Sequence, residues 1–404
     1  MWLPAAAALW LLLQSQDFAA EGLKALEEQK YELAVQHLEK AAQADPDDYS
    51  IQFNLALAYT LTGKDEPAVA GYKKVLALKP GLCEAQLNLG MVLLRMKQPA
   101  EAIPHLEAAA DARPKEIRPR LYLADALFDT GDFARAAQAY AAAVELDPKS
   151  AAAVVGLARS SAHNNQLKEA EAHFRRAAEL DPALKDALLE LGPLYEKNGQ
   201  TAEAIAVYRE FPENIAARER LGHLLIETGK AAEAIPHLEW AVQKAPTSAN
   251  RLALAQAYRD TGQPDKELPL LKQAVDAEPD NLDLRLAYGR ELRDQRKFAE
   301  AAREFYRVVQ GRPDSVEGWN ELSAMLISLE DYPQALAALD RVRALGAERP
   351  VHHFLRAIML DKMRDLKGAL ASYQKFLATD NGQNPNEEFK ARQRVRIIER
   401  ELRK

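Results

Sequence analysis

Cysteine is almost absent from the sequence, because Cys83 is the only one among 404 residues. A disulfide framework and a cysteine-based zinc site are therefore excluded. Aromatic residues are also scarce, at 7% of the chain. Positive charge is not in excess, since 53 lysines and arginines stand against 60 aspartates and glutamates. This balance argues against a nucleic-acid partner, which would require a basic face to neutralise phosphates.

A long apolar run occurs at the start of the chain, where residues 1–13 read MWLPAAAALWLLL. It is shorter than the roughly 20 residues that a membrane-spanning helix needs, so no integral membrane span is expected. Its length matches the hydrophobic region of a signal peptide, although no basic residue precedes it. We expect residues 1–15 to be a signal peptide and the protein to be exported to a periplasm or cell envelope. The alternative is a buried N-terminal helix in a cytoplasmic protein.

Proline marks an internal repeat in the rest of the chain. Five prolines follow one another at a spacing of 34 residues, and three more continue the series at 33 or 34: Pro46, Pro80, Pro114, Pro148, Pro182, Pro246, Pro279 and Pro313. Aligned on them, the chain divides into eleven repeats, which start at Ser15, Tyr49, Cys83, Ile117, Ala151, Lys185, Ile215, Ser248, Leu282, Val316 and Pro350. A period of this length is typical of helical solenoids.

Three other positions of the repeat are equally regular. Position 8 is always Gly, Ala or Ser, position 24 is always large and apolar or aromatic, and position 20 is Ala in every repeat except the eighth, which has Glu267. Apolar spacing predicts two helices in each repeat, with the small residues allowing close approach and the large one filling the space between helices. Gly at position 15, as in Gly63 and Gly131, ends the first helix.

These residues together resemble the tetratricopeptide repeat (TPR) family over nearly the whole chain. The resemblance implies an all-α fold, a right-handed superhelical solenoid of about eleven helix-turn-helix repeats. We expect repeats one to six over residues 16–214 and repeats seven to eleven over 215–381. Repeat six has only 30 residues, because its second helix stops at Pro212. We expect either a local change of superhelix direction there or a deletion absorbed by the loops.

A C-terminal helix follows the last repeat and is expected to cap it, over residues 382–404. Its predicted apolar face carries Phe389, Val395, Ile398 and Leu402, and its other face is basic. Repeat arrays need such a cap over their last apolar face. The alternative is a helix that contacts a membrane or an acidic partner.

In the family, positions 2, 5, 6, 9, 12 and 13 of each repeat face a concave groove that binds peptides or helices. Carried over to repeats two to four, these positions give a set that we call the apolar patch: Phe53, Asn54, Leu57, Leu87, Asn88, Met91, Leu94, Tyr122 and Phe128. In repeats seven to nine they give a set that we call the arginine patch: Arg220, His223, Arg259, Arg290 and Arg293. Both sets are candidate binding surfaces.

Some members of the family clamp a C-terminal carboxylate with paired lysines and asparagines. Asn54 and Asn88 match part of that pattern, but Leu57 and Met91 stand where it has asparagine. The basic partners are also missing, apart from Arg95. A hydrophobic or amphipathic peptide is therefore the expected ligand of the apolar patch.

Catalytic motifs are missing from the sequence, which has no Gly-rich phosphate loop, no H-E-x-x-H and no G-x-S-x-G. His37, His105 and His237 share one repeat position and so lie far apart along the array. We expect no catalytic residue, no metal and no cofactor. The expected function is a non-enzymatic protein-interaction scaffold in an envelope assembly or secretion system. The alternative is a substrate-recruiting accessory subunit of a separately encoded modifying enzyme, such as a glycosyltransferase. The oligomeric state is left open.

Overall fold

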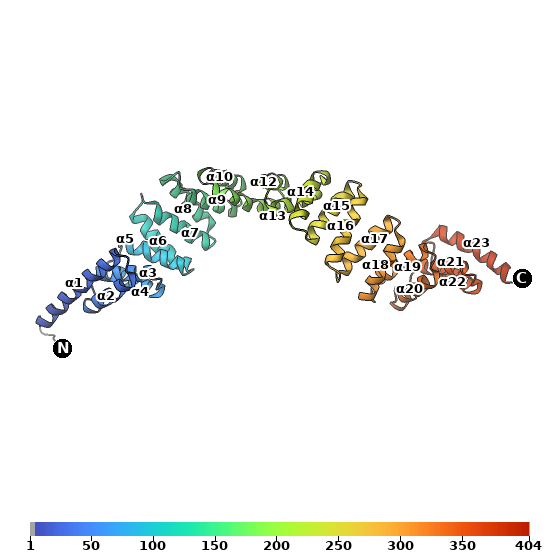
Figure 1. Cartoon of the computed structure of the whole chain (residues 1–404), viewed down its shortest axis with the longest axis horizontal. Coiled ribbons are helices and arrows are strands. Elements are labelled where there is room, and N and C mark those ends of the chain that lie inside the picture. The colour runs from blue at the N-terminus through green and yellow to red at the C-terminus, as the bar shows by residue number, and fades with distance from the viewer. Residues whose placement is uncertain (1–4, 404) are drawn as a thin grey trace. The chain divides into compact units, whose positions relative to one another are not determined.

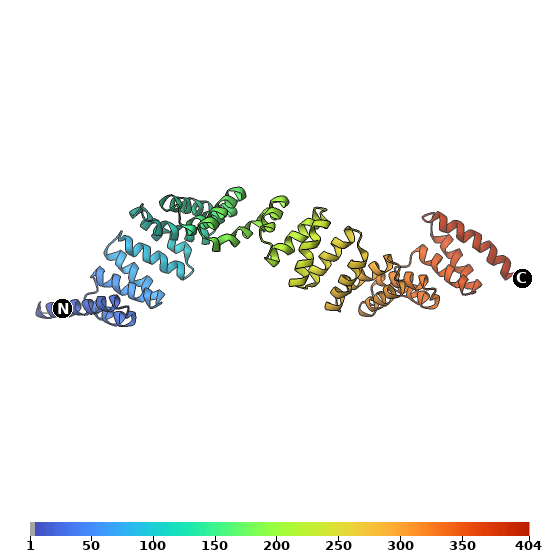
Figure 2. The same cartoon turned by 45° about the horizontal axis from the view of Figure 1, so that its top comes forward.

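The structure, a computed structural model, describes the backbone of residues 5–403 and the side chains of residues 16–403. Over this range the fold is all-α, as predicted, and holds helices without a strand. The chain divides into two compact units, Met1–Val207 and Tyr208–Lys404, which we call the N-terminal and C-terminal units. Within each unit, consecutive helices lie side by side as antiparallel hairpins (Figures 1 and 2).

The N-terminal unit is built from the hairpins of repeats one to six. The first helices of repeats one to five are α1 (Ala5–Glu27), α3 (Tyr49–Leu61), α5 (Cys83–Arg95), α7 (Ile117–Asp129) and α9 (Ala151–His163). The second helices are α2 (Tyr31–Ala44), α4 (Asp65–Leu78), α6 (Pro99–Ala112), α8 (Phe133–Leu146), α10 (Leu167–Leu180) and α12 (Thr201–Arg209), the last of which contains the boundary between the units.

The core of each hairpin forms where the three regular positions meet. Ala102 at position 20 and Leu106 at position 24 are fully buried. A Cβ atom added to Gly90 at position 8 would lie 2.5 Å from the Leu106 side chain. Such a contact is far inside van der Waals distance, so glycine at position 8 sets how closely the two helices approach. The sequence pattern thus reports the packing between the two helices of a repeat.

The turn between the two helices is left-handed in every repeat. The predicted glycines have positive φ, for example 71° at Gly63. In six repeats a residue other than glycine takes the same conformation with φ between 58° and 66°: Gln29, Lys97, Asn165, Arg296, Glu330 and Arg364. The turn geometry is therefore a property of the repeat, even where the glycine that favours it is missing.

Repeat six departs from the pattern in its first helix, which the sequence analysis did not anticipate. It consists of a 3-10 helix, η1 (Pro182–Glu190), followed by the short α11 (Leu191–Lys197). Pro193 lies in the first turn of α11. Since proline lacks an N–H and clashes with the carbonyl four residues earlier, an α-helix is disfavoured through the preceding turn. The predicted change of superhelix direction at this repeat stays a prediction.

The C-terminal unit repeats the same architecture. Its first helices are α13 (Ile215–Glu227), α15 (Ser248–Asp260), α17 (Leu282–Asp294), α19 (Val316–Ser328) and α21 (Pro350–Lys362). Its second helices are α14 (Ala231–Lys244), α16 (Pro264–Ala277), α18 (Phe298–Gly311), α20 (Tyr332–Ala344) and α22 (Leu366–Thr379).

A final helix, α23 (Pro385–Leu402), packs on α22. Ile398 is fully buried, and Val395 packs against the aromatic cluster of the last repeat. The predicted apolar face was wrong at its ends, because Phe389 is 65% exposed and Leu402 is exposed as well. The face that packs carries Ala391 instead, where a small side chain permits close approach. Arg394 reaches back from α23 to Asp361 of α21 in a two-pronged ion pair.

The predicted signal segment, residues 1–15, lies outside the residues whose side chains the structure describes. From Ala5 its backbone is helical and continues into repeat one as α1. Among the described residues, no helix is both long enough and apolar enough to cross a membrane.

Candidate functional site

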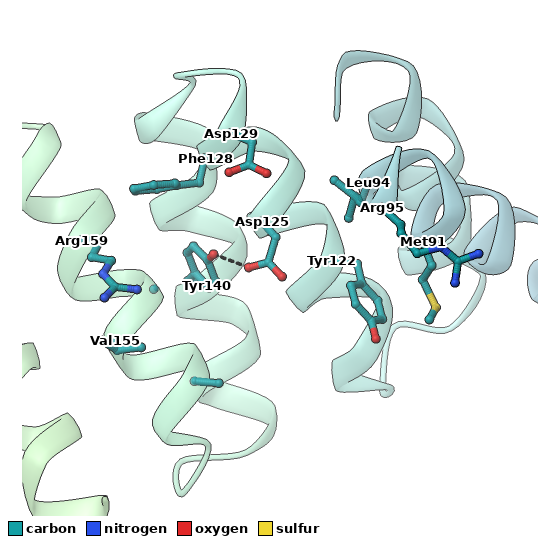
Figure 3. A pocket seen from close by; sticks show the side chains of 12 residues that line it. Met91, Leu94, Arg95, Tyr122, Asp125, Phe128, Asp129, Tyr140, Val155 and Arg159 are labelled. Carbon is teal, nitrogen blue, oxygen red and sulfur yellow. Dashed lines mark hydrogen bonds between the residues drawn. The ribbon is translucent and has the colours of Figure 1, made fainter. Parts of the chain in front are cut away.

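A pocket of about 650 Å³ opens on the N-terminal unit, where the first helices of repeats three, four and five lie next to one another. Its walls come from α5, α7 and α9, and its base from α8 (Figure 3). The residues that line it are Met91, Leu94, Arg95, Tyr122, Asp125, Phe128, Asp129, Tyr140, Ala152, Val155, Gly156 and Arg159. All but Tyr140 occupy the repeat positions that face the groove in the family.

The centre of the pocket is a tyrosine–carboxylate pair. The Tyr140 hydroxyl donates a hydrogen bond of 2.5 Å to Oδ1 of Asp125 (Figure 3). Gly156 makes room for the tyrosine ring, because a Cβ atom at this position would lie 2.3 Å from it. Any larger residue at position 156 would push the ring aside. Glycine in the middle of α9 is therefore explained by packing, despite its poor helix propensity.

The second carboxylate of the pocket, Asp129, lies one helical turn after Asp125 on α7. Burial raises the pKa of Asp125, the hydrogen bond from Tyr140 opposes this rise, and the charge of Asp129 adds to it. Burial also raises the pKa of Tyr140, as does its bond to Asp125, so the phenol keeps its proton and remains a donor. Within the described residues, neither carboxylate is paired with a lysine or arginine.

The two arginines of the pocket are already engaged by carboxylates outside it. Arg159 makes a forked ion pair with Glu190, with N–O distances of 2.7 to 3.1 Å. Arg95 forms an ion pair with Asp65 and donates a 3.2 Å hydrogen bond to the carbonyl of Thr60. Forked arginine–carboxylate pairs are geometrically fixed, so these two positive charges are balanced before any ligand arrives.

An aromatic stack holds one edge of the pocket in place. The ring of Phe128 meets Phe133 and His163 edge to face, with centroid distances of 5.2 and 5.4 Å. Phe133 and His163 themselves stack at 4.2 Å. Because Phe128 is held on two sides, it presents a fixed apolar surface to the pocket.

The pocket contains part of the predicted apolar patch and lies one repeat further along the chain. Met91, Leu94, Tyr122 and Phe128 line it. Phe53 and Leu87 pack against the buried core of repeats two and three. Asn54 donates a hydrogen bond of 2.9 Å to the carbonyl of Ser50 in its own helix. Asn88 forms a hydrogen bond with the Tyr72 hydroxyl. Leu57 is half-buried and lies outside the pocket. Peptide binding by the patch stays a prediction.

Sequence reasoning missed the polar half of this pocket. Asp125, Asp129 and Arg159 occupy groove positions 9, 13 and 9 of their repeats, so the template could have found them. Asp125 and Asp129 are charged and so differ from the apolar patch around them, and Arg159 belongs to repeat five, beyond the repeats that contain that patch. Tyr140 belongs to the core position 24, and only its pairing with Gly156 brings it into the groove.

The arginine patch in the C-terminal unit is largely neutralised within the chain. Arg259 pairs with Glu267 and Glu291, and Arg290 and Arg293 both pair with Glu321. His223 is half-buried, and burial lowers its pKa, so it favours the neutral form. A pocket of about 420 Å³ lies beside these pairs, lined by Arg290, Val316, Glu317, Asn320, Glu321 and Arg349.

No group of three or more His, Cys, Asp or Glu residues in the described part of the chain is arranged to hold a metal ion. His105, one of the repeated histidines, contacts Oε1 of Gln86 through Nδ1 at 2.6 Å. What the arrangement of the larger pocket offers is fixed apolar surface, two carboxylates and a tyrosine, a combination suited to reversible binding of an extended ligand.

The fold defines a class of proteins that are built from stacked helical hairpins with regular small and large packing positions. Models described as tetratricopeptide repeat match residues 25–90, 93–136, 121–185, 186–214, 248–291, 286–350 and 325–384, well over half of the chain. The chain belongs to the tetratricopeptide repeat family, whose members act as protein-interaction scaffolds.

Solved structures with a similar hairpin array include two of MamA and one of YrrB. A MamA double mutant designated RS-1 ArsTM is 27% identical, with a TM-score of 0.40, and covers 42% of this chain and 96% of its own. MamA of Desulfovibrio magneticus is 26% identical, with a TM-score of 0.40, and its match covers 42% of this chain and 96% of its own. YrrB, described as a TPR protein with an unusual peptide-binding site, is 21% identical, with a TM-score of 0.40. Its match covers 41% of this chain and 85% of its own.

Proposed function

We propose that this protein is a non-enzymatic scaffold that binds a peptide or helical segment of a partner protein in the pocket of repeats three to five. The observation that carries the proposal is the pocket itself. It is built by three consecutive first helices, and eleven of its twelve lining residues occupy groove positions. Its volume of about 650 Å³ falls within the range of about 300–1,000 Å³ that is typical of ligand sites.

The mixture of side chains supports a peptide over a small apolar molecule. Met91, Leu94 and Phe128 offer surface to apolar side chains, while carboxylates and Tyr122 lie between them. Amphipathic segments use apolar anchors at regular spacing, with polar groups that fix their orientation. The pocket spans three consecutive first helices, so a continuous chain bound there could contact each of them.

A crosslinking experiment tests this proposal directly. We would place a photoreactive amino acid at Ala152, which is exposed and lines the pocket, and at Ala108, which is exposed on α6 outside it. Crosslinks to one defined segment of a partner at position 152, and none to that segment at position 108, are expected. The partner's identity then separates an envelope component from a soluble modifying enzyme.

A matched pair of variants follows once the crosslinked segment is available as a peptide. Ala152→Trp fills the pocket, because it adds a large side chain at an exposed position, and should abolish binding. Ala108→Trp makes the same change outside the pocket and should leave the affinity unchanged. Equal affinity for both variants, or crosslinks to the same segment from position 108, would overturn the proposal.

We infer also that the protein acts outside the cytoplasm, in an envelope assembly or secretion system. What supports this is the apolar run of residues 1–13, whose length matches a signal peptide. Expression in a bacterial host, followed by mass measurement of the purified chain, tests it. A mature N-terminus near residue 16 in the envelope fraction would support export, and an intact chain in the cytosol would contradict it.

A further inference from the structure

The larger pocket has a charge imbalance that its composition conceals. By count its two arginines balance its two aspartates. Each arginine, however, is tied to a carboxylate outside the pocket, Arg95 to Asp65 and Arg159 to Glu190. Asp125 and Asp129 have no such counter-charge among the described residues. A ligand in the pocket therefore meets two uncompensated negative charges.

Aromatic rings surround these two carboxylates. In Figure 3, Asp125 points into the middle of the pocket between Tyr122 and Tyr140, while Asp129 lies next to Phe128 at its rim. The faces of such rings attract cations and also pack against methylene groups. Carboxylates one helical turn apart, framed by rings, suit a long side chain that has an apolar stem and a cationic end.

We propose that the pocket receives a lysine or arginine side chain of the bound segment, flanked in that segment by apolar residues. This inference rests on the proposed function and names the chemistry of the partner. The cation would lie between Asp125 and Asp129, its stem against Tyr122 and Phe128. The neighbouring apolar residues would contact Met91 and Leu94 on one side and Val155 on the other.

An acidic segment is disfavoured by the same contacts. It would place negative charge beside Asp125 and Asp129, and could be accepted by Arg95 or Arg159 only by breaking their existing ion pairs. Like charges in a partly desolvated site repel more strongly than in water. The protein therefore differs from a groove that clamps a C-terminal carboxylate, which presents positive charge to its ligand.

The test is a selection from a random peptide library on the full-length chain, with three receptors in parallel. These are the wild type, Asp125→Asn/Asp129→Asn, and the control Asp111→Asn/Glu145→Gln. The control removes the same charge from exposed positions of α6 and α8 outside the pocket. Asn at 125 keeps the acceptor for Tyr140, and thermal unfolding of each variant checks that the fold is intact.

We expect the wild type and the control to select one motif with a fixed Lys or Arg among apolar residues. Affinity of the motif peptide for Asp125→Asn/Asp129→Asn should fall about 10- to 100-fold, which is the loss of a charge-assisted contact. Replacing the basic residue of the peptide by norleucine should produce a similar loss with the wild type and little further loss with the variant.

Two outcomes distinguish failure of this inference from failure of the proposed function. A motif that is blocked by Ala152→Trp but has no basic residue, or that binds Asp125→Asn/Asp129→Asn unchanged, overturns the cationic occupant and leaves the peptide groove standing. If Ala152→Trp binds the peptides selected on the wild type with unchanged affinity, the pocket is not the binding site and both proposals fail.

Discussion

The grooves of the N-terminal and C-terminal units are built on the same template and yet have opposite electrostatic outcomes. In repeats seven to nine, three of the four arginines of the arginine patch, Arg259, Arg290 and Arg293, are paired with Glu267, Glu291 and Glu321. In repeats three to five, fewer charges occupy the groove, and two carboxylates stay uncompensated. Three arginines of the C-terminal groove therefore already have a partner within the chain, whereas two carboxylates of the N-terminal groove have no cationic one among the described residues.

The comparison teaches that a repeat template predicts which side chains face the groove and does not predict which of them are available. Availability depends on partners from neighbouring repeats, about 30 residues away in the sequence. Glu321 of α19 reaches Arg290 and Arg293 of α17, at 3.0 and 2.6 Å. Pairings of this kind connect one repeat to the next, and the arginines in them already have a partner within the chain.

Glu267 is the clearest case of such a pairing. It replaces the alanine found at position 20 in every other repeat, and it is only 1% exposed. Arg259, on the first helix of the same repeat, bonds its carboxylate, and the Arg259 Nε–Oε1 distance is 2.7 Å. A buried carboxylate is tolerated when a paired cation compensates its lost hydration. Arg259 therefore provides the paired cation for Glu267, the one residue at position 20 that is not alanine.

The largest expected effect comes from placing that glutamate where no arginine can meet it. Ala170→Glu puts a carboxylate at position 20 of repeat five, whose position 12 is Ala162. Ala170 is fully buried. We expect the free energy of unfolding to fall by about 3–5 kcal/mol, because an unpaired charge is buried. Urea unfolding followed by circular dichroism measures it.

The reverse change, Glu267→Ala, is the control for that prediction. Arg259 is 46% exposed and keeps Glu291 as a partner, so it does not become a buried orphan. The loss should stay below about 1 kcal/mol. Equal losses for Ala170→Glu and Glu267→Ala would show that Arg259 does not compensate Glu267.

A feature of this molecule is easier to predict from the sequence when the residues that determine it lie within one repeat than when they lie in different repeats. Packing at positions 8, 20 and 24 lies within one repeat, so the pattern Gly90, Ala102, Leu106 was sufficient to predict it. The predicted apolar patch lies in repeats two to four, whereas the pocket lies in repeats three to five and shares four residues with the patch. The charge of the pocket depends on Asp65 and Glu190, which lie in the repeats on either side of it, so the charge is determined between repeats and not within one.

Two of the features that the sequence did not predict have local causes. Repeat six begins with a 3-10 helix because Pro193 disfavours an α-helix through the turn before it. Tyr140 enters the groove because Gly156 lacks a side chain. A reading of the first helices for glycine at groove positions would have found Gly156.

A smaller effect is expected from removing the carboxylate that two groove arginines share. Glu321→Gln leaves Arg290 and Arg293 with weaker acceptors, and Glu321 is only 15% exposed. We expect a loss of about 1–3 kcal/mol in the free energy of unfolding. Glu317→Gln removes a more exposed partner of Arg290 and should cost less than about 1 kcal/mol. If the two variants unfold at the same urea concentration, the shared pair contributes little, and the contrast between the grooves weakens.

The stability of the C-terminal unit should also respond to pH through Glu267. Burial raises the pKa of Glu267 above its usual 4.5, the bond to Arg259 lowers it by less, and Glu291 adds to the rise. The folded state therefore keeps this proton to higher pH than the unfolded state does. Consequently the contribution of Glu267 to the free energy of unfolding falls as pH rises through 4.5 toward the raised pKa.

Comparison with Glu267→Gln isolates that dependence. The wild type should lose stability relative to Glu267→Gln as the pH is raised from below 4.5 to neutral. Glu300→Gln, at an exposed position on α18, removes the same charge outside this ion pair and serves as the control variant. If the wild type instead becomes more stable relative to Glu267→Gln as the pH rises, the ion pair with Arg259 outweighs the effect of burial on Glu267.

The smallest effect concerns a backbone feature that the two units share. Lys97 and Arg296 occupy the left-handed turn with φ of 58° and 59°, in the N-terminal and C-terminal units. Glycine removes the strain of about 1–2 kcal/mol, and its greater freedom in the unfolded chain offsets part of the gain. We expect Lys97→Gly and Arg296→Gly each to add about 0.5–1 kcal/mol to the free energy of unfolding. Because the turn is set within each repeat, the two gains should be equal in spite of the different grooves. A gain in one unit only would show that contacts beyond the repeat hold the other turn in place.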